Sequence, residues 1–488
     1  MYRQECYDQL RMDLPFGVEL DANNRWIKLA GMFPWKEIEE EYIRNFSSPE
    51  GQIAKPARLA FGALYIQTAE GFTDEQTRRH IQENPYLQFF CGFKEYTMRS
   101  PFDASMMTYF RKRISSEMLQ RIAAITFADE AKKVIDNPEE GNNEDEEPQI
   151  VSERYDNKGT LILDATCCPA DIHYPTDIGL LNQSRELTEE IIDVLYKSIQ
   201  DRYAYKPRTY RKKARKEYLG YAKKRTHTKK EIRRAIRGQL QYAARNFRTI
   251  DELVDRGAEL TTLEAGLYRK LLVIKELFRQ QKYMYDNQTH QVEGRIVSIT
   301  QPHIRPIVRG KEHEPTEFGA KVSIGLVGGY AFITCMDWDN YSEAKTLEDA
   351  AEAYCEIFGF YPKTIIGDRA YPTRDNRQWC QERHIRLSGP RLGRKSMETK
   401  AYEKKQIYQD SCKRNAVEGE FGTCKRRYGL DRIMAKLPDT SKTSIAMGFF
   451  AANMERKLRL LFAPLEDWAL DFDSDLSWLV IFPRNSVL

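Results

Sequence analysis

The segment that decides the fold reads LILDAT and spans residues 161–166. Three apolar residues lead into Asp164, and two small residues follow it. Residues 364–369 read TIIGDR and repeat this form around Asp368. A short apolar run bounded by turn residues predicts a buried strand. Each segment is therefore expected to deliver one carboxylate at its end or just past it, and a third carboxylate beside this pair would complete a metal site.

Further strands and helices follow between and after these two segments. Apolar alternation over 322–326, a Gly-Gly pair at 328–329 and an apolar run at 331–336 predict a β-hairpin. A helix is expected over 347–358, and residues 385–387 read as a short strand. Three strands thus precede βαβ elements, which is the order of an RNase H-like mixed sheet.

A long helical block, about 184–287, interrupts this order directly after the first strand. Leu187, Ile191, Leu195 and Ile199 recur every four residues, as in an amphipathic helix with one buried stripe. The predicted fold class is α/β: an RNase H-like mixed sheet core with a large helical insertion after the first strand, plus an all-α N-terminal domain.

The N-terminal region, 1–135, reads as several short helices separated by tight turns. One is expected at 103–114 and carries Arg111, Lys112 and Arg113 near its end. A basic last helix suits a helix-turn-helix-like DNA-binding unit. A plain helical bundle with a solvated basic face has the same pattern, so both interpretations stay open.

Composition places the chain among soluble globular proteins. Of its 488 residues, 41% are hydrophobic and 30% charged, and no apolar run approaches the roughly 18 residues of a membrane span. The N-terminus has no apolar stretch of the kind found in signal peptides. Nine cysteines form no C-x-x-C pair, so we expect reduced thiols in a cytoplasmic protein, without a disulfide framework or a zinc site.

Charge is concentrated, although the net charge is only +4. Residues 206–237 contain 15 Lys or Arg and two acidic residues. A solvated helix face usually mixes signs, so a polyanion such as nucleic acid is the better explanation. The predicted DNA-binding residues in this stretch are Arg211, Lys212, Lys213, Arg215, Lys216, Lys223, Lys224, Arg225, Lys229, Lys230, Arg233, Arg234 and Arg237.

The third carboxylate is expected on a helix over about 411–427. Arg414, Glu418 and Lys425 lie at offsets of four and seven, which places them within about 60° on one helical face. Glu420 points elsewhere. Taken alone, Arg414 and Glu418 suit a surface ion pair. Together with the two strand-end aspartates, Glu418 completes an oxygen-only site suited to Mg²⁺ or Mn²⁺.

A weaker candidate lies in the loop after the first strand. His173 stands between Asp171 and Asp177, which could form a metal cluster or a structural arrangement. The structural interpretation is the commoner one for a loop histidine, and we expect Asp177 to cap the following helix.

These motifs resemble the DDE transposases of bacterial insertion sequences, and the resemblance covers about residues 40–455. The first motif is Asp164-Ala165-Thr166, continued by 171–177, and the second is GDRAY at 367–371. The third fits R-x3-E-x6-K from Arg414 through Glu418 to Lys425. Ser411 departs from the pattern, because related families have tyrosine there. Residues 305–311 and 386–395 are also similar to this family.

The resemblance implies that Asp164, Asp368 and Glu418 are the catalytic residues and ligate two Mg²⁺ or Mn²⁺ ions, with Arg414 and Lys425 binding DNA. It implies cutting at the element's ends and joining of the freed 3′-OH to target DNA by two-metal-ion phosphoryl transfer. The implied partners are double-stranded terminal inverted repeats, target DNA and a second copy of the chain, in the bacterial cytoplasm at the nucleoid and away from membranes. The alternatives are a metal-dependent nuclease without strand transfer and a non-catalytic DNA-binding protein derived from a transposase.

The predicted divisions are 1–135 as a helical N-terminal DNA-binding domain, 136–149 as an acidic linker, 150–183 as the first part of the RNase H-like core, 184–290 as a basic helical insertion, 291–462 as the second part of the core, and 463–488 as a C-terminal tail.

Overall fold

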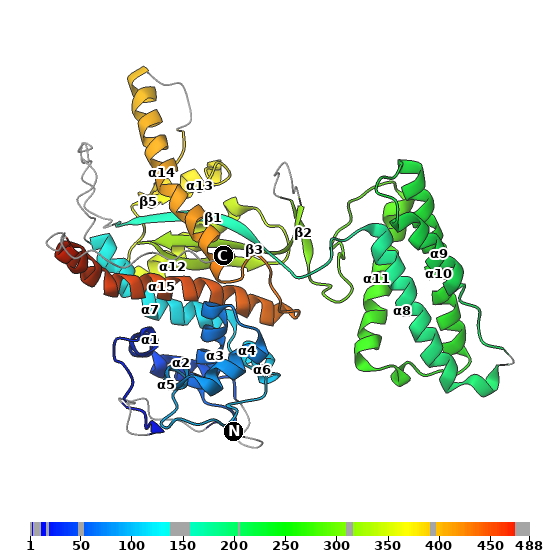
Figure 1. Cartoon of the computed structure of the whole chain (residues 1–488). Coiled ribbons are helices and arrows are strands. Elements are labelled where there is room, and N and C mark those ends of the chain that lie inside the picture. Colours follow the sequence, from blue (N-terminus) through cyan, green and yellow to red (C-terminus); the bar gives the residue numbers. More distant parts are fainter. Residues whose placement is uncertain are drawn as a thin grey trace.

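The structure is a computed structural model (Figure 1), and it describes residues 2, 11–15, 19–46, 53–136, 157–203, 205–308, 316–390 and 397–473. Of these, the side chains of 397–403 and 462–473 are not described. The predicted linker therefore lies outside the described residues, except for Asp136. The same holds for parts of the similar segments 305–311 and 386–395 and for residues 474–488 of the predicted tail.

In the described part of the chain, six strands form one mixed sheet. They are β1 Thr160–Pro169, β2 Arg305–Val308, β3 Thr316–Val327, β4 Tyr330–Asp337, β5 Thr364–Ile366 and β6 Arg386–Leu387. The order is β2-β3-β1-β5-β6, and β4 also pairs with β3. β1 pairs with β3 antiparallel and with β5 parallel, and β6 extends the parallel part. The RNase H-like mixed sheet predicted from the sequence is confirmed.

The predicted hairpin joins β3 to β4. Its two central residues, Gly328 and Gly329, have φ angles of 57° and 82°. Two positive φ angles in a two-residue loop are the geometry of a type I′ turn, whose twist matches that of the flanking strands. Glycine adopts this conformation without the steric penalty of a side chain, which explains the Gly-Gly pair.

Helices cover the sheet. Those that follow β4 are α12 Leu347–Phe358, α13 Arg374–Glu382, α14 Met397–Arg427 and α15 Pro438–Asp473. Two of them, α14 and α15, extend beyond the predicted limits. α12 ends at Gly359 as predicted, with φ at 85°. The start predicted for α14, near Ser411, is wrong, because the helix already begins at Met397. α15 continues past residue 462, so its backbone crosses the predicted start of the tail.

The described N-terminal region consists mainly of helices. They are α1 Arg25–Met32, α2 Trp35–Ile43, α3 Ala57–Glu70, α4 Asp74–Glu83, α5 Pro85–Phe90, α6 Met106–Arg113 and α7 Ser116–Asp136. These helices share one hydrophobic core with the sheet. Phe450 of α15 lies at its centre, with ring centroids 5.8 Å from Phe33, 5.5 Å from Phe61 and 5.3 Å from Phe127. α15 therefore joins the N-terminal helices to the sheet (Figure 1).

The helical insertion has a second, separate core. Its helices are α8 Asp177–Ser198, α9 Arg211–Ala222, α10 Lys229–Asp255 and α11 Ala265–Asp286. They stand to one side of the sheet (green in Figure 1). Ile191 and Leu195 of the predicted stripe are fully buried there. The insertion after the first strand is thus confirmed, although its first helix begins at Asp177 rather than near residue 184.

The prediction that Asp177 caps this helix is wrong. Thr176 is the N-cap, and its Oγ1 accepts a hydrogen bond from the backbone N–H of Gly179 at 3.2 Å. Asp177 instead forms an ion pair of 2.8 Å with Arg295, on the segment that follows α11. A threonine side chain can cap a helix, as an aspartate side chain can. Asp177 is therefore available for its ion pair with Arg295, which links the first helix of the insertion to the segment after the last one.

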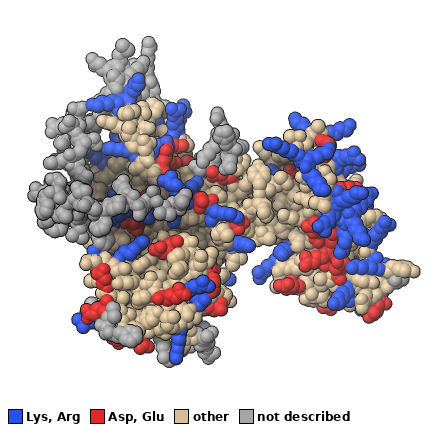
Figure 2. Space-filling model, viewed as in Figure 1, with Lys and Arg blue, Asp and Glu red and all other residues tan. Residues whose placement is uncertain are grey.

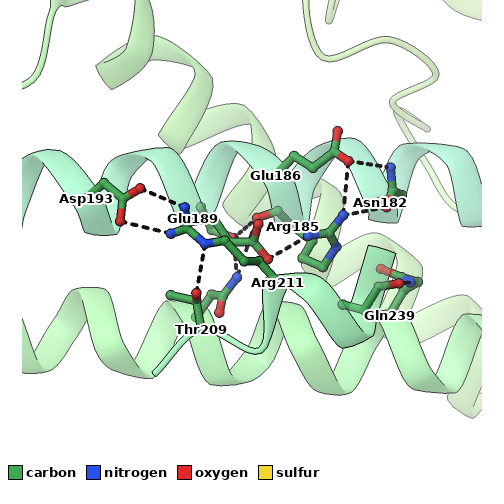
Figure 3. A network of polar contacts seen from close by, with 11 residues as sticks. Asn182, Arg185, Glu186, Glu189, Asp193, Thr209, Arg211 and Gln239 are labelled. Atoms are coloured by element: carbon green, nitrogen blue, oxygen red, sulfur yellow. Dashed lines mark hydrogen bonds and ion pairs between the residues drawn. The ribbon is translucent and has the colours of Figure 1, made fainter. Parts of the chain in front are cut away.

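A buried polar network links three helices of the insertion (Figure 3). Arg185 of α8 is only 1% exposed and forms an ion pair of 2.6 Å with Glu189. Arg185 also donates to Asn182 at 2.7 Å. Asn246 of α10 donates to Thr188 at 2.9 Å, and Arg211 of α9 forms a bidentate pair with Asp193. The partners of the Arg185 guanidinium all lie on α8, and the contacts of Asn246 and Arg211 are the ones that link α8 to α10 and α9.

Among the described residues, no helix combines the length and the apolar character that a membrane span needs.

Candidate active site and nucleic-acid interface

The register of β1 and β5 brings the two predicted aspartates together. Ile162 pairs with Ile366 in the parallel ladder. Asp164 and Asp368 each lie two residues beyond this pair, at the same sequence separation. For Asp164, still within β1, a step of two returns to the same face, whereas Asp368 lies in the loop two residues past the end of β5. The two carboxylates therefore lie on neighbouring segments at one end of the parallel pair.

Asp164 lies in a largely buried environment, with its side chain 15% exposed. Burial is the main cause that raises the pKa of its carboxyl to about 6, and repulsion from Glu343 and Asp368 adds to it. The backbone N–H of Ala165, which donates to Oδ1 at 2.8 Å, and the Arg414 guanidinium act in the opposite direction. The surroundings of Asp164 therefore oppose its ionisation, and an added positive charge beside it would favour the ionised form.

The loop after β5 holds Asp368 by close packing. The fully buried ring of Tyr371 lies over Gly367, where an added Cβ would be 2.6 Å from Cδ2 of the ring. Any side chain at this position would displace the tyrosine. Oδ1 of Asp368 accepts a hydrogen bond from the backbone N–H of Ala370 at 2.8 Å. The glycine and the tyrosine of the GDRAY motif therefore have a packing role, in addition to the carboxylate that the motif supplies.

α14 carries the third predicted acid and lies against β1. Arg386 of β6 forms a bidentate pair with the buried Asp410 of α14, at 2.8 and 2.7 Å. This pair fixes the helix beside the sheet. Further along, Nη1 of Arg414 lies 3.6 Å from Oδ2 of Asp164, and Nη2 donates to Oε1 of Glu418 at 2.9 Å. One guanidinium thus bridges two of the three predicted catalytic residues.

This bridge bears on the two sequence interpretations of Arg414 and Glu418, and metal binding by Glu418 stays a prediction. The predicted i,i+4 ion pair exists, but its arginine also reaches Asp164, so it is more than a surface pair. Lys425, near the end of α14, is close enough to Cys167 of β1 to lower the pKa of that thiol, although burial raises it more. Glu420 lies on another face, where it accepts from Cys424 at 3.6 Å.

The donor set suits hard divalent ions, because every predicted ligand is a carboxylate. Even so, no group of three His, Cys, Asp or Glu side chains within the described residues is arranged closely enough to hold a metal ion. Arg414 lies between Asp164 and Glu418 instead. The side chain of Glu418 is 55% exposed. The metal site stays a prediction whose chemistry fits the residues present.

Sequence reasoning missed Glu343, which begins the 3-10 helix η4 Glu343–Thr346 between β4 and α12. Its charge acts on Asp164, and it forms an ion pair of 2.9 Å with Lys321 of β3. No strand or helix periodicity marks this residue, because tertiary folding alone brings it to the site. Tyr371 belongs to the GDRAY motif, but the sequence pattern does not indicate its complete burial.

The weaker metal candidate around His173 is not supported by the contacts of its neighbours. Asp171 accepts a hydrogen bond from Nε of Arg432 at 2.9 Å, and Asp177 pairs with Arg295. His173 itself is exposed. Both acids are therefore used by arginines, as the structural interpretation predicts.

The basic stretch forms the surface of α9, α10 and the turn between them (Figure 2). Arg211, Lys224 and Arg233 are engaged within the insertion, with Asp193, with Glu231 and with the Tyr285 ring and carbonyl, respectively. The other predicted DNA-binding residues of this stretch are exposed, and no ion pair of theirs is present in the described residues: Lys212, Lys213, Arg215, Lys216, Lys223, Arg225, Lys229, Lys230, Arg234 and Arg237. These ten residues are termed the open basic surface below.

The cations of α6 are less open than predicted. Arg111 is 13% exposed and pairs with Asp74 of α4. The guanidinium of Arg113 lies 4.8 Å from the Phe46 ring centroid. Lys112 is the exposed member of the three. DNA binding by α6 stays a prediction, and the contacts of Arg111 and Arg113 agree better with the helical-bundle interpretation.

Two known protein-family models match separate parts of the chain. Residues 365–455 match a family model described as "Transposase DDE domain". Residues 16–113 match one described as "Transposase domain (DUF772)". The predicted resemblance to DDE transposases is confirmed. The transposase DDE match contains Asp368, Arg414 and Glu418, whereas Asp164 precedes it, and the other match contains α1 to α6.

One relative is the protein named "Uncharacterized protein ORF8 in nfe locus" from Rhizobium meliloti. It is 38% identical over 96 residues, which are 20% of this transposase-like chain and 46% of that protein. The chain thus spans less than half the length of this relative. No solved structure matches the chain significantly.

Proposed function

We propose that the protein is a DNA transposase that cuts at the ends of an insertion sequence and joins the freed 3′-OH to target DNA. The observation that carries the proposal is the meeting of Asp164, Arg414 and Glu418 beside Asp368, three of which lie in the segment similar to the transposase DDE domain. In this proposal, carboxylates from two strand ends and one helix come together as an oxygen-rich site when Arg414 no longer lies between Asp164 and Glu418. Such a site suits phosphoryl transfer.

The reaction has two displacements at phosphorus. In the first, a water oxygen bonds to the phosphorus at the element end, and the bond to the 3′ oxygen breaks, which leaves a 3′-OH. In the second, this 3′ oxygen bonds to a target phosphorus, loses its proton and displaces the target's own 3′ oxygen. Two bound divalent ions supply activation of the attacking oxygen and stabilisation of the leaving oxygen.

The residues of this chain have separate parts in the proposal. Asp164, Asp368 and Glu418 hold the two Mg²⁺ or Mn²⁺ ions. Arg414 leaves its two carboxylates and, with Lys425, contacts DNA phosphates. The open basic surface binds the DNA backbone away from the reaction centre. Two element ends are processed together, so the DNA complex contains a homodimer.

Substitution of two ligands tests the site. In Asp368→Asn and Glu418→Gln, Mg²⁺-dependent cleavage of element-end DNA is expected to fall by about 100-fold, since each change removes a charged oxygen ligand. Asp375→Asn is the matched control, because Asp375 is exposed on α13 near Asp368. Cleavage that persists in both ligand variants shows that the catalytic residues are assigned wrongly.

The same reactions distinguish the alternatives when a target plasmid is added. Joined products identify a transposase. Cut element ends without joined products identify a metal-dependent nuclease. DNA binding without either product identifies a non-catalytic protein derived from a transposase.

A further inference from the structure

The cations of α10 continue along one face of the helix beyond the basic stretch that the sequence shows. Residues that follow one another by three or four positions lie on one side of a helix. On α10 they are Lys230, Arg234, Arg237, Gln241, Arg245 and Arg248. Ala243, Asn246 and Ile250 are buried on the opposite side. The six residues are termed the basic face of α10 below, and the helix lies on the side of the insertion away from the sheet (Figure 1).

The basic face of α10 is open to a partner. Its side chains are exposed except that of Arg245, which is half-buried. None of its five cations forms an ion pair in the described part of the chain, where the ion pairs of the insertion use other cations. The exposed Glu252, four residues after Arg248, ends the run of positive charge. Such a row of unpaired cations is complementary to a polyanion.

A tyrosine outside α10 holds one arginine of this face beside another arginine. The guanidinium carbons of Arg208 and Arg245 each lie 4.4 Å from the ring centroid of Tyr210. The two cations are therefore less than about 9 Å apart and repel each other. Neither forms an ion pair with an acid among the described residues. A bound anion relieves this repulsion, so the pair is arranged for a negatively charged partner.

The backbone of Tyr210 shows that its side chain matters. Its φ angle is 56°, in the left-handed region that residues with a side chain rarely adopt. Tyr210 precedes α9, and its side chain makes no capping hydrogen bond to that helix. Glycine or asparagine adopts this conformation at a lower cost. The contact of the ring with the two guanidinium groups is thus the reason for a tyrosine at this position.

We propose that the DNA-binding surface of the insertion extends along α10 as far as Arg248. Arg208 and Arg245 contact phosphates within it, and Tyr210 positions both arginines. The proposal rests on the proposed function and deepens it, because it adds phosphate contacts and gives the direction of the duplex. From Lys230 to Arg248 the helix rises by about 27 Å. Duplex DNA rises by about 3.4 Å per base pair, so a duplex that lies along α10 is contacted over about eight base pairs.

Binding of the full-length protein to duplex DNA, measured without divalent ions over a range of salt concentrations, tests this extension. A duplex of about 20 base pairs and arbitrary sequence is long enough to cover the basic face of α10. In Arg248→Ala the slope of log affinity against log salt is expected to fall by about 0.9, because one phosphate is no longer neutralised. An unaltered slope in this variant overturns the proposal.

Arg269→Ala is the matched control for the loss of one charge. Arg269 lies on α11 of the same insertion, is exposed and has no ion pair among the described residues. Its replacement is expected to leave the slope as it is in the unaltered protein. If Arg269→Ala and Arg248→Ala lower the slope equally, the insertion attracts DNA by its total charge and the basic face of α10 is not the contact.

Variants of Tyr210 test its positioning role. Tyr210→Leu keeps every charge but removes the ring, so the affinity for the duplex is expected to fall about fivefold with little change in slope. Tyr210→Phe keeps the ring and is expected to bind as the unaltered protein does. Tyr285→Leu is the control, because it removes the ring that lies 4.3 Å from the guanidinium of Arg233, which is not part of the basic face. If Tyr210→Phe or Tyr285→Leu is as weak as Tyr210→Leu, the ring of Tyr210 does not position the arginines.

Failure of this inference is distinguishable from failure of the proposed function. If Asp368→Asn abolishes cleavage of element-end DNA while Arg248→Ala leaves the salt slope unaltered, the extension along α10 is wrong and the transposase proposal stands. If Arg248→Ala lowers the slope but the unaltered protein cuts no element-end DNA, the surface binds DNA and the transposase proposal is wrong.

Discussion

The raised pKa of Asp164, about 6, has a consequence for stability. An aspartate in an unfolded chain has a pKa of about 3.9. Below that pH the carboxyl is protonated in both states and costs nothing. As pH rises toward and through 6, the unfolded chain releases its proton first, so ionisation favours unfolding. Without divalent ions, the folded protein therefore loses stability between about pH 4 and pH 7.

Asp164→Asn removes this cost. At pH 8 in a chelating buffer, the variant is expected to be more stable by on the order of 2 kcal/mol, and near pH 3.5 the difference is expected to vanish. Thermal unfolding at the two pH values measures it. Glu418→Gln, at a side chain that is 55% exposed, is the control and should change little. A less stable Asp164→Asn at pH 8 would contradict the burial of an uncompensated charge.

How far the site could be predicted differs from residue to residue. Asp164 and Asp368 could be found because each follows a short apolar strand, and the parallel register then pairs them. Glu418 could be found from helical spacing to Arg414 and Lys425. Glu343 could not, because it follows an irregular loop and its ion-pair partner, Lys321, comes from β3. Only tertiary contacts identify it.

At the scale of elements, the sequence predicts the periodic helices and most strands, including the short strands β5 and β6, but not β2. The stripe of α8 and the helix α12 have clear apolar spacing. β2 has four residues without a clear apolar pattern, and its order comes from antiparallel pairing with the longer β3. The early part of α14 has no apolar periodicity of its own, so its start was placed too late. The N-cap of α8 was predicted wrongly because Thr176 and Asp177 are adjacent, and the side chain of either could accept a hydrogen bond from a backbone N–H of the helix.

The buried network of α8 gives a prediction about the insertion's stability. Arg185→Met leaves Glu189, 6% exposed, without its ion-pair partner. Because an unpaired buried charge is costly, the variant is expected to lose about 3–5 kcal/mol. Unfolding of the variant and of the unaltered protein in denaturant, followed by a signal from the insertion, measures this loss of stability.

Two further variants separate charge burial from packing. Arg185→Met combined with Glu189→Leu is expected to recover most of the loss, since no charge then remains buried alone. Arg211→Met disrupts the more exposed pair with Asp193, where the arginine side chain is 42% exposed, and should cost less than about 1 kcal/mol. Equal losses in Arg185→Met and Arg211→Met would show that burial does not set the energy of this network.

At the scale of the whole molecule, the described residues form two separate hydrophobic cores. One core joins the N-terminal helices, the sheet and α15, and it positions the acids of the candidate site. The other supports α8, α10 and α11, and the basic surface of α9 and α10 stands on it. The insertion begins eight residues after β1 ends, so the proposed DNA-binding surface is joined closely to the strand that delivers Asp164. The acids and the cations are thus kept apart in space and close in the chain.

This separation predicts that DNA affinity and chemistry can be altered independently. Replacement of Lys216, Arg234 and Arg237 by alanine is expected to weaken DNA binding. The slope of log affinity against log salt should fall by about 0.9 for each phosphate that the protein no longer neutralises. Mn²⁺ binding at the acids should be unchanged. Binding of duplex DNA over a range of salt concentrations measures the slope.

The matched control takes three cations of the same insertion that already have partners. Lys275, Arg279 and Lys282 of α11 pair with Asp251, Glu276 and Asp286, at 3.9, 2.6 and 2.8 Å. Their replacement by alanine removes the same formal charge, but these side chains are held by acids and are not on α9 or α10. A smaller change in slope is therefore expected. Equal slopes for the two triple variants would mean that the insertion attracts DNA by its total charge alone, and that the surface of α9 and α10 is not where the backbone binds.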